Sequence, residues 1–165
     1  MNDKPDEREP VEPVQHRGRY FDELSIGAIY QHRPGRTIDG SLNVLFTSMT
    51  GNTQSLHLDE HFASETEFGT RLVNSLLTMS VVVGLSVSDM TEGTTVANLG
   101  FEEIRFPAPV LHGDTLYSET EVVALRPSAS RPAQGVATFE HRGLNQRGEL
   151  VCLARRAALM LTSEH

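Results

Sequence analysis

The alternation of apolar and polar residues predicts helices in the first half of the chain and strands in the second. Between residues 42 and 49, apolar residues recur at the three- and four-residue spacing of a helix. Residues 74–90 are apolar on nearly all sides, which is typical of a buried helix. The many valines of this segment also fit a strand, but its length and the capping residue Asn74 favour a helix.

The polar residues between these two segments predict where shorter elements begin and end. Thr37, Asp39 and Ser41 are candidate caps for the first helix, and Gly51 is expected to end it. Asp59 is placed to cap a second, short helix over residues 60–65. Residues 50–59 are rich in turn formers, so we expect a loop there rather than a regular helix.

The second half of the chain reads as an antiparallel meander. Strands are expected at residues 94–99, 101–106, 115–125, 135–144 and 149–161, after a short strand that starts near Ile29. Residues 145–148 join the last two strands as a hairpin. Helices followed by such strands predict an α+β fold, in which a long bent sheet wraps around the buried helix. An unpaired sheet edge favours a homodimer or a higher homo-oligomer.

Length and charge narrow the class of protein. The chain has 165 residues, a net charge of -8 and a pI near 5.3, which fits a single domain over residues 18–165 and argues against a nucleic-acid surface. Residues 1–17 are charged and proline-rich, typical of a disordered or docking arm.

No apolar run is long enough for a membrane span, and the N-terminus is unlike a signal peptide, so we expect a cytoplasmic protein. Cys152, alone, is expected in the core.

His57 is the residue of the polar loop best suited to proton chemistry, because its unperturbed pKa lies near neutrality. The competing interpretation is a histidine that only forms hydrogen bonds within the loop. Residues 57–61 also match the His-x-x-Glu-His pattern of zinc hydrolases, which needs both histidines on one helical turn. Asp59, a cap between His57 and His61, disfavours that arrangement, so no metal and no other cofactor is expected.

Several motifs, taken in order, resemble those of the MaoC-like hydratases. They are Gly51-Asn52-Thr53-Gln54-Ser55-Leu56-His57, Phe68-Gly69, Asn74-Ser75, and the block from Arg105-Phe106 to Gly113-Asp114-Thr115-Leu116. The resemblance covers about residues 19–161. It implies a hotdog fold and a cofactor-independent hydro-lyase that reversibly hydrates an α,β-unsaturated acyl-CoA thioester to a 3-hydroxyacyl-CoA.

The chain departs from the family pattern at the residues that matter most. Asn52 replaces the family's catalytic aspartate, Gln54-Ser55 its Asn-Pro, and Asn74-Ser75 its His-Gly. These changes resemble a branch that acts on small branched dicarboxylic thioesters of the mesaconyl-, itaconyl- or methylmalyl-CoA type.

The resemblance implies a role for each matched residue. His57 transfers protons, and Asn52 and Gln54 hold the water, since an amide cannot act as a base at neutral pH. The Ser75 N–H, at the start of the buried helix, stabilises the thioester oxygen. The remaining substrate-binding candidates are Ser55, Asn74 and Arg105, the last for a CoA phosphate or a substrate carboxylate. Asn52 also reads as a plain turn residue, Asn74 as an N-cap, and Arg105 as an exposed strand arginine.

Two questions stay open at the level of sequence. The first is what replaces the missing aspartate: His57 acting alone, the substrate's own carboxylate, or a carboxylate from Asp59, Glu102 or Glu103, which read equally as caps or solvated charges. The second is whether the protein is a catalyst. A non-catalytic hotdog module that binds acyl-CoA or supports a partner subunit is favoured by the loss of the aspartate, and the enzyme is favoured by retention of His57.

Overall fold

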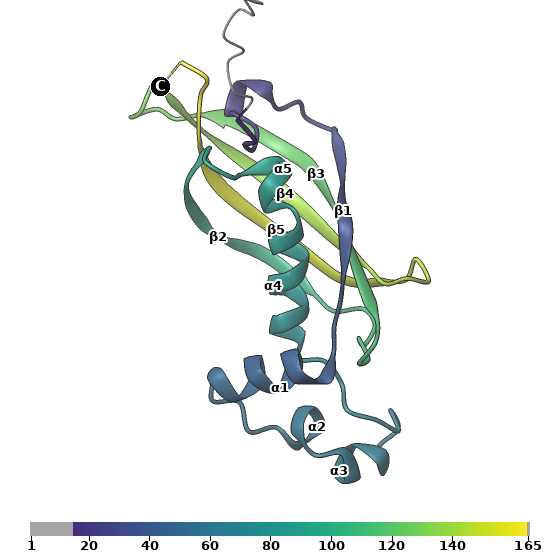
Figure 1. Cartoon of the computed structure of the whole chain (residues 1–165). Coiled ribbons are helices and arrows are strands. Elements are labelled where there is room, and N and C mark those ends of the chain that lie inside the picture. The colour runs from purple at the N-terminus through teal and green to yellow at the C-terminus, as the bar shows by residue number, and fades with distance from the viewer. Residues whose placement is uncertain (1–14, 165) are drawn as a thin grey trace, which may run out of the picture.

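The computed structural model describes residues 15–164, which fold into one five-stranded antiparallel sheet with a helix lying along one of its faces (Figure 1). The strand order is β1-β3-β4-β5-β2. The strands are β1 (Ile29–Thr37), β2 (Thr95–Arg105), β3 (Thr115–Pro127), β4 (Gln134–Leu144) and β5 (Leu150–Leu161). Most of the predicted N-terminal arm, residues 1–17, lies outside the described residues.

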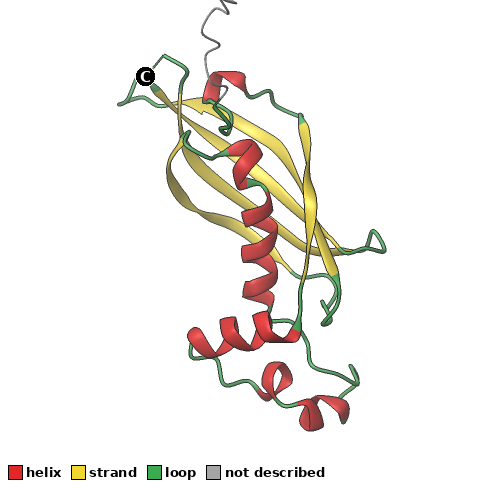
Figure 2. Cartoon of the chain, viewed as in Figure 1, coloured by secondary structure: helices red, strands yellow, loops and turns green. Residues whose placement is uncertain are grey.

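The helices are unevenly distributed around this sheet (Figure 2). They are η1 (Phe21–Glu23), α1 (Gly40–Met49), α2 (Ser55–Leu58), α3 (Glu60–Ser64), α4 (Ser75–Leu85) and α5 (Val87–Met90). Helix α4 runs along the sheet, whereas α1, α2 and α3 gather near the N-terminal end of α4. The α+β arrangement of a sheet bent around a long helix is therefore confirmed.

The predicted caps place the helices as expected. The Asp39 carboxylate accepts a hydrogen bond from the Leu42 N–H at 2.8 Å and begins α1. Asp59 begins α3, and Asn74 begins α4 in the same way. Gly51 follows α1 with φ of +68°, a backbone conformation that favours glycine, and so ends the helix where the sequence indicated.

The segment 74–90 differs from its prediction in two respects. It forms two helices, because the first ends at Leu85 and Ser86 turns its hydroxyl back to the carbonyl of Val83, at 2.7 Å. It is also not buried on all sides, since the side of α4 that faces away from the sheet leaves Leu76 52% exposed. No other described part of the chain covers that side.

The strands also differ in detail from the sequence pattern. Residues 95–105 form one continuous strand rather than two, because Gly100, with φ of +141°, carries the chain through a register shift. Strand β1 runs for nine residues and not only near Ile29. In β3 the predicted alternation holds up to the buried Val122, but a register shift before Ala124 leaves that residue exposed.

The core between α4 and the sheet depends on close contact between the two layers. Gly143 on β4 lies directly against the Val82 side chain of α4, so that any Cβ at this position would collide with it. Val82, Cys152 and Ala154 form a buried cluster at this contact. Burial raises the pKa of the Cys152 thiol to about 11, which makes it the inert core residue that the sequence predicted.

Candidate functional site

A largely apolar cavity of about 320 Å³ lies at the N-terminal end of α4. Its lining comes from α2, the segment between α3 and α4, the first turns of α4, the chain that follows β2, and the start of β5. The lining residues are His57, Phe68, Leu72, Val73, Ser75, Thr78, Phe106, Pro107, Ala108, Pro109, Val110 and Val151. Of the residues predicted to form the site, the structure brings His57 and Ser75 together here.

His57 is carried by a short helix that the sequence did not predict. The side-chain oxygen of Asn52 accepts a hydrogen bond from the Gln54 N–H at 2.9 Å, and this turn leads directly into α2. The expectation of a loop throughout residues 50–59 was therefore wrong, whereas His57 does precede the helix that Asp59 caps, as expected. The helix has only four residues, which is too short to show periodicity.

One hydrogen bond fixes the imidazole of His57. Its Nδ1 lies 3.0 Å from the carbonyl oxygen of Leu72, which can only accept a hydrogen bond. Nδ1 must therefore carry the proton, and in the neutral ring Nε2 is left with its lone pair. Among the described residues Nε2 has no hydrogen-bond partner, and the half-buried ring lines the cavity. This is the tautomer that a general base requires.

The start of α4 supplies the other half of the site. Asn74 is only 2% exposed; its Oδ1 caps the Leu76 N–H at 3.0 Å, and its Nδ2 donates to the Thr47 hydroxyl at 3.3 Å. Asn74 is therefore an N-cap. Ser75 follows it at the first position of the helix, where backbone N–H groups have no intrahelical acceptor and carry partial positive charge.

The other predicted residues do not line the cavity. Asn52, Gln54 and Ser55 belong to the turn that begins α2. Arg105 ends β2 with its side chain 72% exposed, and its Nε forms an ion pair with Glu103 at 2.5 Å. It nevertheless immediately precedes Phe106, which is part of the lining.

The carboxylates suggested as replacements for the missing aspartate are also outside the lining. Asp59 accepts a hydrogen bond from the Phe62 N–H at 3.0 Å and so serves as the cap of α3. Glu102 is exposed, and Glu103 is paired with Arg105. The extended backbone of Asp59 places His57 and His61 in separate helices, and within residues 15–164 no three histidine, cysteine or acidic side chains are grouped to hold a metal ion.

The sequence did not single out the residues that close and support this cavity. Thr78 is a buried polar side chain in the lining, one turn after the predicted cap. Phe106, Pro107 and Pro109 belong to the motif block that begins at Arg105, but their place in it indicated no role in the site, where they form an apolar wall. Asn43 is fully buried on α1 and contacts the segments on either side of the site.

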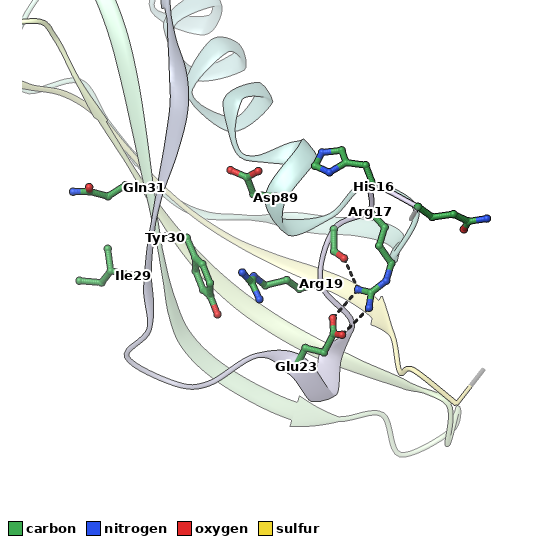
Figure 3. Close-up of a pocket in the computed structure, with 10 residues that line it drawn as sticks. His16, Arg17, Arg19, Glu23, Ile29, Tyr30, Gln31 and Asp89 are labelled. Atoms are coloured by element: carbon green, nitrogen blue, oxygen red, sulfur yellow. Dashed lines mark hydrogen bonds and ion pairs between the residues drawn. The ribbon is translucent and has the colours of Figure 1, made fainter. Parts of the chain in front are cut away.

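A second, larger cavity of about 710 Å³ lies near the opposite end of the sheet (Figure 3). It is lined by residues 15–19, Glu23, residues 29–31 and Asp89, and it contains none of the predicted site residues. Arg17 and Glu23 form an ion pair at 2.7 Å beside it.

Comparison with known proteins defines first the class and then the family. A Mycobacterium tuberculosis protein described as having a double hotdog fold superimposes with a TM-score of 0.81 and 31% identity, over 91% of this chain and 46% of that one. The fold is therefore a hotdog fold. Residues 22–143 match the family described as the MaoC like domain, so the chain belongs to the MaoC-like family.

Two curated relatives carry named activities. The mesaconyl-CoA hydratase of Cereibacter sphaeroides is 34% identical over 81% of this chain, but only 38% of that protein is covered. The 3-hydroxybutyryl-CoA dehydratase of Methylorubrum extorquens is 32% identical over 68% of this chain and 69% of its own length. The chain thus spans well under half of the first of these proteins. In residues 15–164, no helix has both the length and the hydropathy of a membrane span.

Proposed function

We propose that the protein reversibly adds water to the double bond of an α,β-unsaturated acyl-CoA thioester. The observation that carries the proposal is the state of His57: Nδ1 is held by the Leu72 carbonyl, and Nε2 is left without a partner beside the first turn of α4. Membership of the MaoC-like family and the named activities of its relatives support the same reaction.

The proposed reaction uses one imidazole twice. His57 Nε2 takes a proton from water as the water oxygen bonds to the β-carbon, and the electron pair of the double bond moves onto the thioester as an enolate. The Ser75 N–H donates a hydrogen bond to the enolate oxygen. The imidazolium then returns its proton to the α-carbon, so that one water has been added and His57 is neutral again.

Asn52 has a supporting role in this scheme. Its Oδ1 is occupied by the Gln54 N–H, whereas its Nδ2 has no partner among the described residues. An amide cannot remove a proton, but its N–H groups can donate to the oxygen of the attacking water. Because His57 makes both proton transfers and Asn52 only holds the water, the proposed reaction needs no carboxylate base.

The acyl group is proposed to be small, because the cavity has a volume of only about 320 Å³. Its lining is mostly apolar, which suits the hydrocarbon part of such a group. The mesaconyl-CoA hydratase relative supports a branched dicarboxylic substrate, which brings a second carboxylate. Arg105 is the proposed partner of that carboxylate, since it adjoins Phe106 in the lining and its present partner, Glu103, is a carboxylate that a substrate can replace.

The test follows the absorbance of the conjugated thioester with crotonyl-CoA and with mesaconyl-CoA. We expect both to be hydrated, with the higher kcat/KM for mesaconyl-CoA. In Arg105→Gln, kcat/KM should fall about tenfold for mesaconyl-CoA and remain unchanged for crotonyl-CoA, because only the former loses a charge-assisted hydrogen bond. Binding of both thioesters without hydration would instead indicate a non-catalytic acyl-CoA-binding module.

The proposed assembly is a homodimer that pairs through β2. Of the two edge strands, β1 carries Arg33, Pro34 and Arg36, residues that discourage pairing. The other edge strand, β2, exposes Val96, Leu99 and Ile104. Sedimentation of the wild type and of Leu99→Lys tests this, with a dimer expected for the first and a monomer for the second.

A further inference from the structure

Asn43 is a fully buried polar residue of α1 that reaches both halves of the proposed site. Its Nδ2 lies 3.1 Å from the carbonyl oxygen of Leu72 and 3.3 Å from that of His57. Its Oδ1 lies 2.8 Å from the backbone N–H of Asn74, the residue that precedes Ser75. One side chain therefore connects the helix that carries the imidazole to the helix that carries the thioester donor.

The chemistry of its partners allows only one orientation of this amide. The carbonyl oxygens of Leu72 and His57 only accept hydrogen bonds, so the NH₂ group must face them. The N–H of Asn74 only donates, so the amide oxygen must face it. The same NH₂ group, which has two hydrogens for three neighbouring acceptors, also lies 3.1 Å from Nε2 of His112, so this nitrogen cannot carry a proton toward it.

His112 is consistent with this arrangement, because it must be neutral to accept. Burial and the neighbouring Arg71 lower the pKa of His112, although Glu60 and Asp39 oppose the shift. A neutral His112 keeps its proton on Nδ1 and leaves Nε2 for the amide of Asn43. These contacts of the Asn43 side chain thus all favour the orientation in which its NH₂ group faces the carbonyls of Leu72 and His57.

The carbonyl of Leu72 is the point where Asn43 acts on His57. This oxygen accepts from Nδ1 of His57 at 3.0 Å and from Nδ2 of Asn43 at 3.1 Å. Whatever fixes this carbonyl also fixes the plane of the imidazole and the nitrogen that carries its proton. Through Asn74, the same amide also fixes the position at which α4 begins.

We infer that Asn43 is a positioning residue, which sets Nε2 of His57 and the N–H of Ser75 at a defined separation around one carbonyl. This inference rests on the proposed function, because it assigns Asn43 to the hydration reaction. Asn43 does not line the cavity and so contributes little to substrate binding. Its loss should lower kcat far more than it changes KM, since displacements near 1 Å cost on the order of 100-fold in rate.

The experiment compares Asn43→Ala and Asn43→Asp with a matched control, Asn145→Ala. Asn145 is also buried, its side chain accepts from the N–H groups of Arg147 and Glu149 in the β4–β5 hairpin, and it does not line the cavity. Asn43→Asp keeps the acceptor for Asn74 but replaces the donor by an oxygen. The readouts are kcat and KM with mesaconyl-CoA, thermal unfolding, and the ring-nitrogen NMR signals of His57, assigned with His57→Ala.

We expect wild-type His57 to carry its proton on Nδ1. Both Asn43 variants should lose about 10- to 100-fold in kcat and shift His57 toward a mixture of tautomers, with KM changed less than about threefold. Asn145→Ala should lose comparable thermal stability, while its kcat and the His57 signals stay as in the wild type.

The inference is overturned if the Asn43 variants lower kcat no more than Asn145→Ala does and leave the His57 signals unchanged. Failure of the proposed function looks different, because the wild type itself would then show no turnover. In that case the NMR signals still decide whether Asn43 positions the ring. If Asn43→Ala does not fold, Asn43→Asp carries the same comparison.

Discussion

The histidines of the proposed site and of the core differ in whether both ring nitrogens have a hydrogen-bond partner. In the site, His57 uses only Nδ1, and its Nε2 has no partner among the described residues. In the core, His32 uses both nitrogens, with the Asp89 carboxylate and the Thr120 hydroxyl each at 2.8 Å. His141 likewise contacts Thr120 and Arg156. The nitrogen without a partner distinguishes His57, the histidine proposed to transfer protons, from these two structural histidines.

The core network has a fixed direction at its Arg156 end. The guanidinium of Arg156 can only donate, so Nε2 of His141 accepts from it at 2.9 Å, and His141 keeps its proton on Nδ1. That proton is donated to the hydroxyl of Thr120, which also shares a hydrogen bond with Nε2 of His32, and Nδ1 of His32 donates to the Asp89 carboxylate. His141 is therefore neutral, and the network ends at the larger cavity, which Asp89 lines (Figure 3).

The sharpest test of the comparison is His57→Ala. We expect turnover to fall by about 1,000-fold, because general acid–base groups contribute on the order of 100- to 10,000-fold. Thermal stability should change little, since the ring makes a single hydrogen bond. His61→Ala is the matched control, because His61 is exposed on α3 and does not line the cavity. Equal kcat in the two variants would remove His57 from the mechanism.

The reciprocal test is His141→Phe. We expect the free energy of unfolding to fall by about 3 kcal/mol, because Thr120 and Arg156 each lose a buried hydrogen-bond partner. Urea denaturation measures this loss, and kcat of the folded protein should match the wild type. A large loss of kcat with intact stability would mean that the core network takes part in the reaction.

A pH series sharpens the same comparison. Burial, followed by the charge of Arg156 and then His32, lowers the pKa of His141 to about 3. An unfolded histidine takes up its proton near pH 6.5, so below that pH the unfolded chain binds a proton that the folded chain does not. Stability from His141 is therefore complete above about pH 6.5 and is lost as the pH falls toward about 3, at no more than about 1.4 kcal/mol per pH unit.

Measurement of the free energy of unfolding at about pH 7.5 and about pH 5 checks this effect. The wild type should lose more stability over this interval than His141→Phe, because the variant lacks the group. Identical slopes for the two proteins would contradict a depressed pKa at His141.

The smallest expected effect concerns Asn52. Asn52→Ala removes the acceptor of the Gln54 N–H and the group proposed to hold the water, so we expect kcat/KM to fall about fivefold and stability by about 1 kcal/mol. Asn52→Asp keeps the acceptor and should retain the stability of the wild type. Stability that is unchanged in Asn52→Ala would show that this turn does not support α2.

The sequence predicted those elements whose signals are local. The caps Asp39, Asp59 and Asn74 each act within three residues of their own position, and the alternation along β3 follows from one strand. The family motifs located His57 and Ser75, which meet in the cavity.

What the sequence missed depends on contacts between distant segments. Asn43 acts across separations of 14 to 69 residues, and no pattern within α1 marks it. The exposed side of α4 was misjudged for a similar reason: hydrophobicity along a helix does not say whether the same chain covers each of its faces. Helix α2 has only four residues, which leaves no periodicity to recognise in the sequence.

The contact of Gly143 with Val82 has a consequence for how substrate is received. Because there is no room for even a methyl group between α4 and the sheet at this point, we expect α4 to keep its position when the proposed thioester binds. The cavity at the N-terminal end of α4 would then be preformed, and little of the binding free energy would be spent on reshaping the protein.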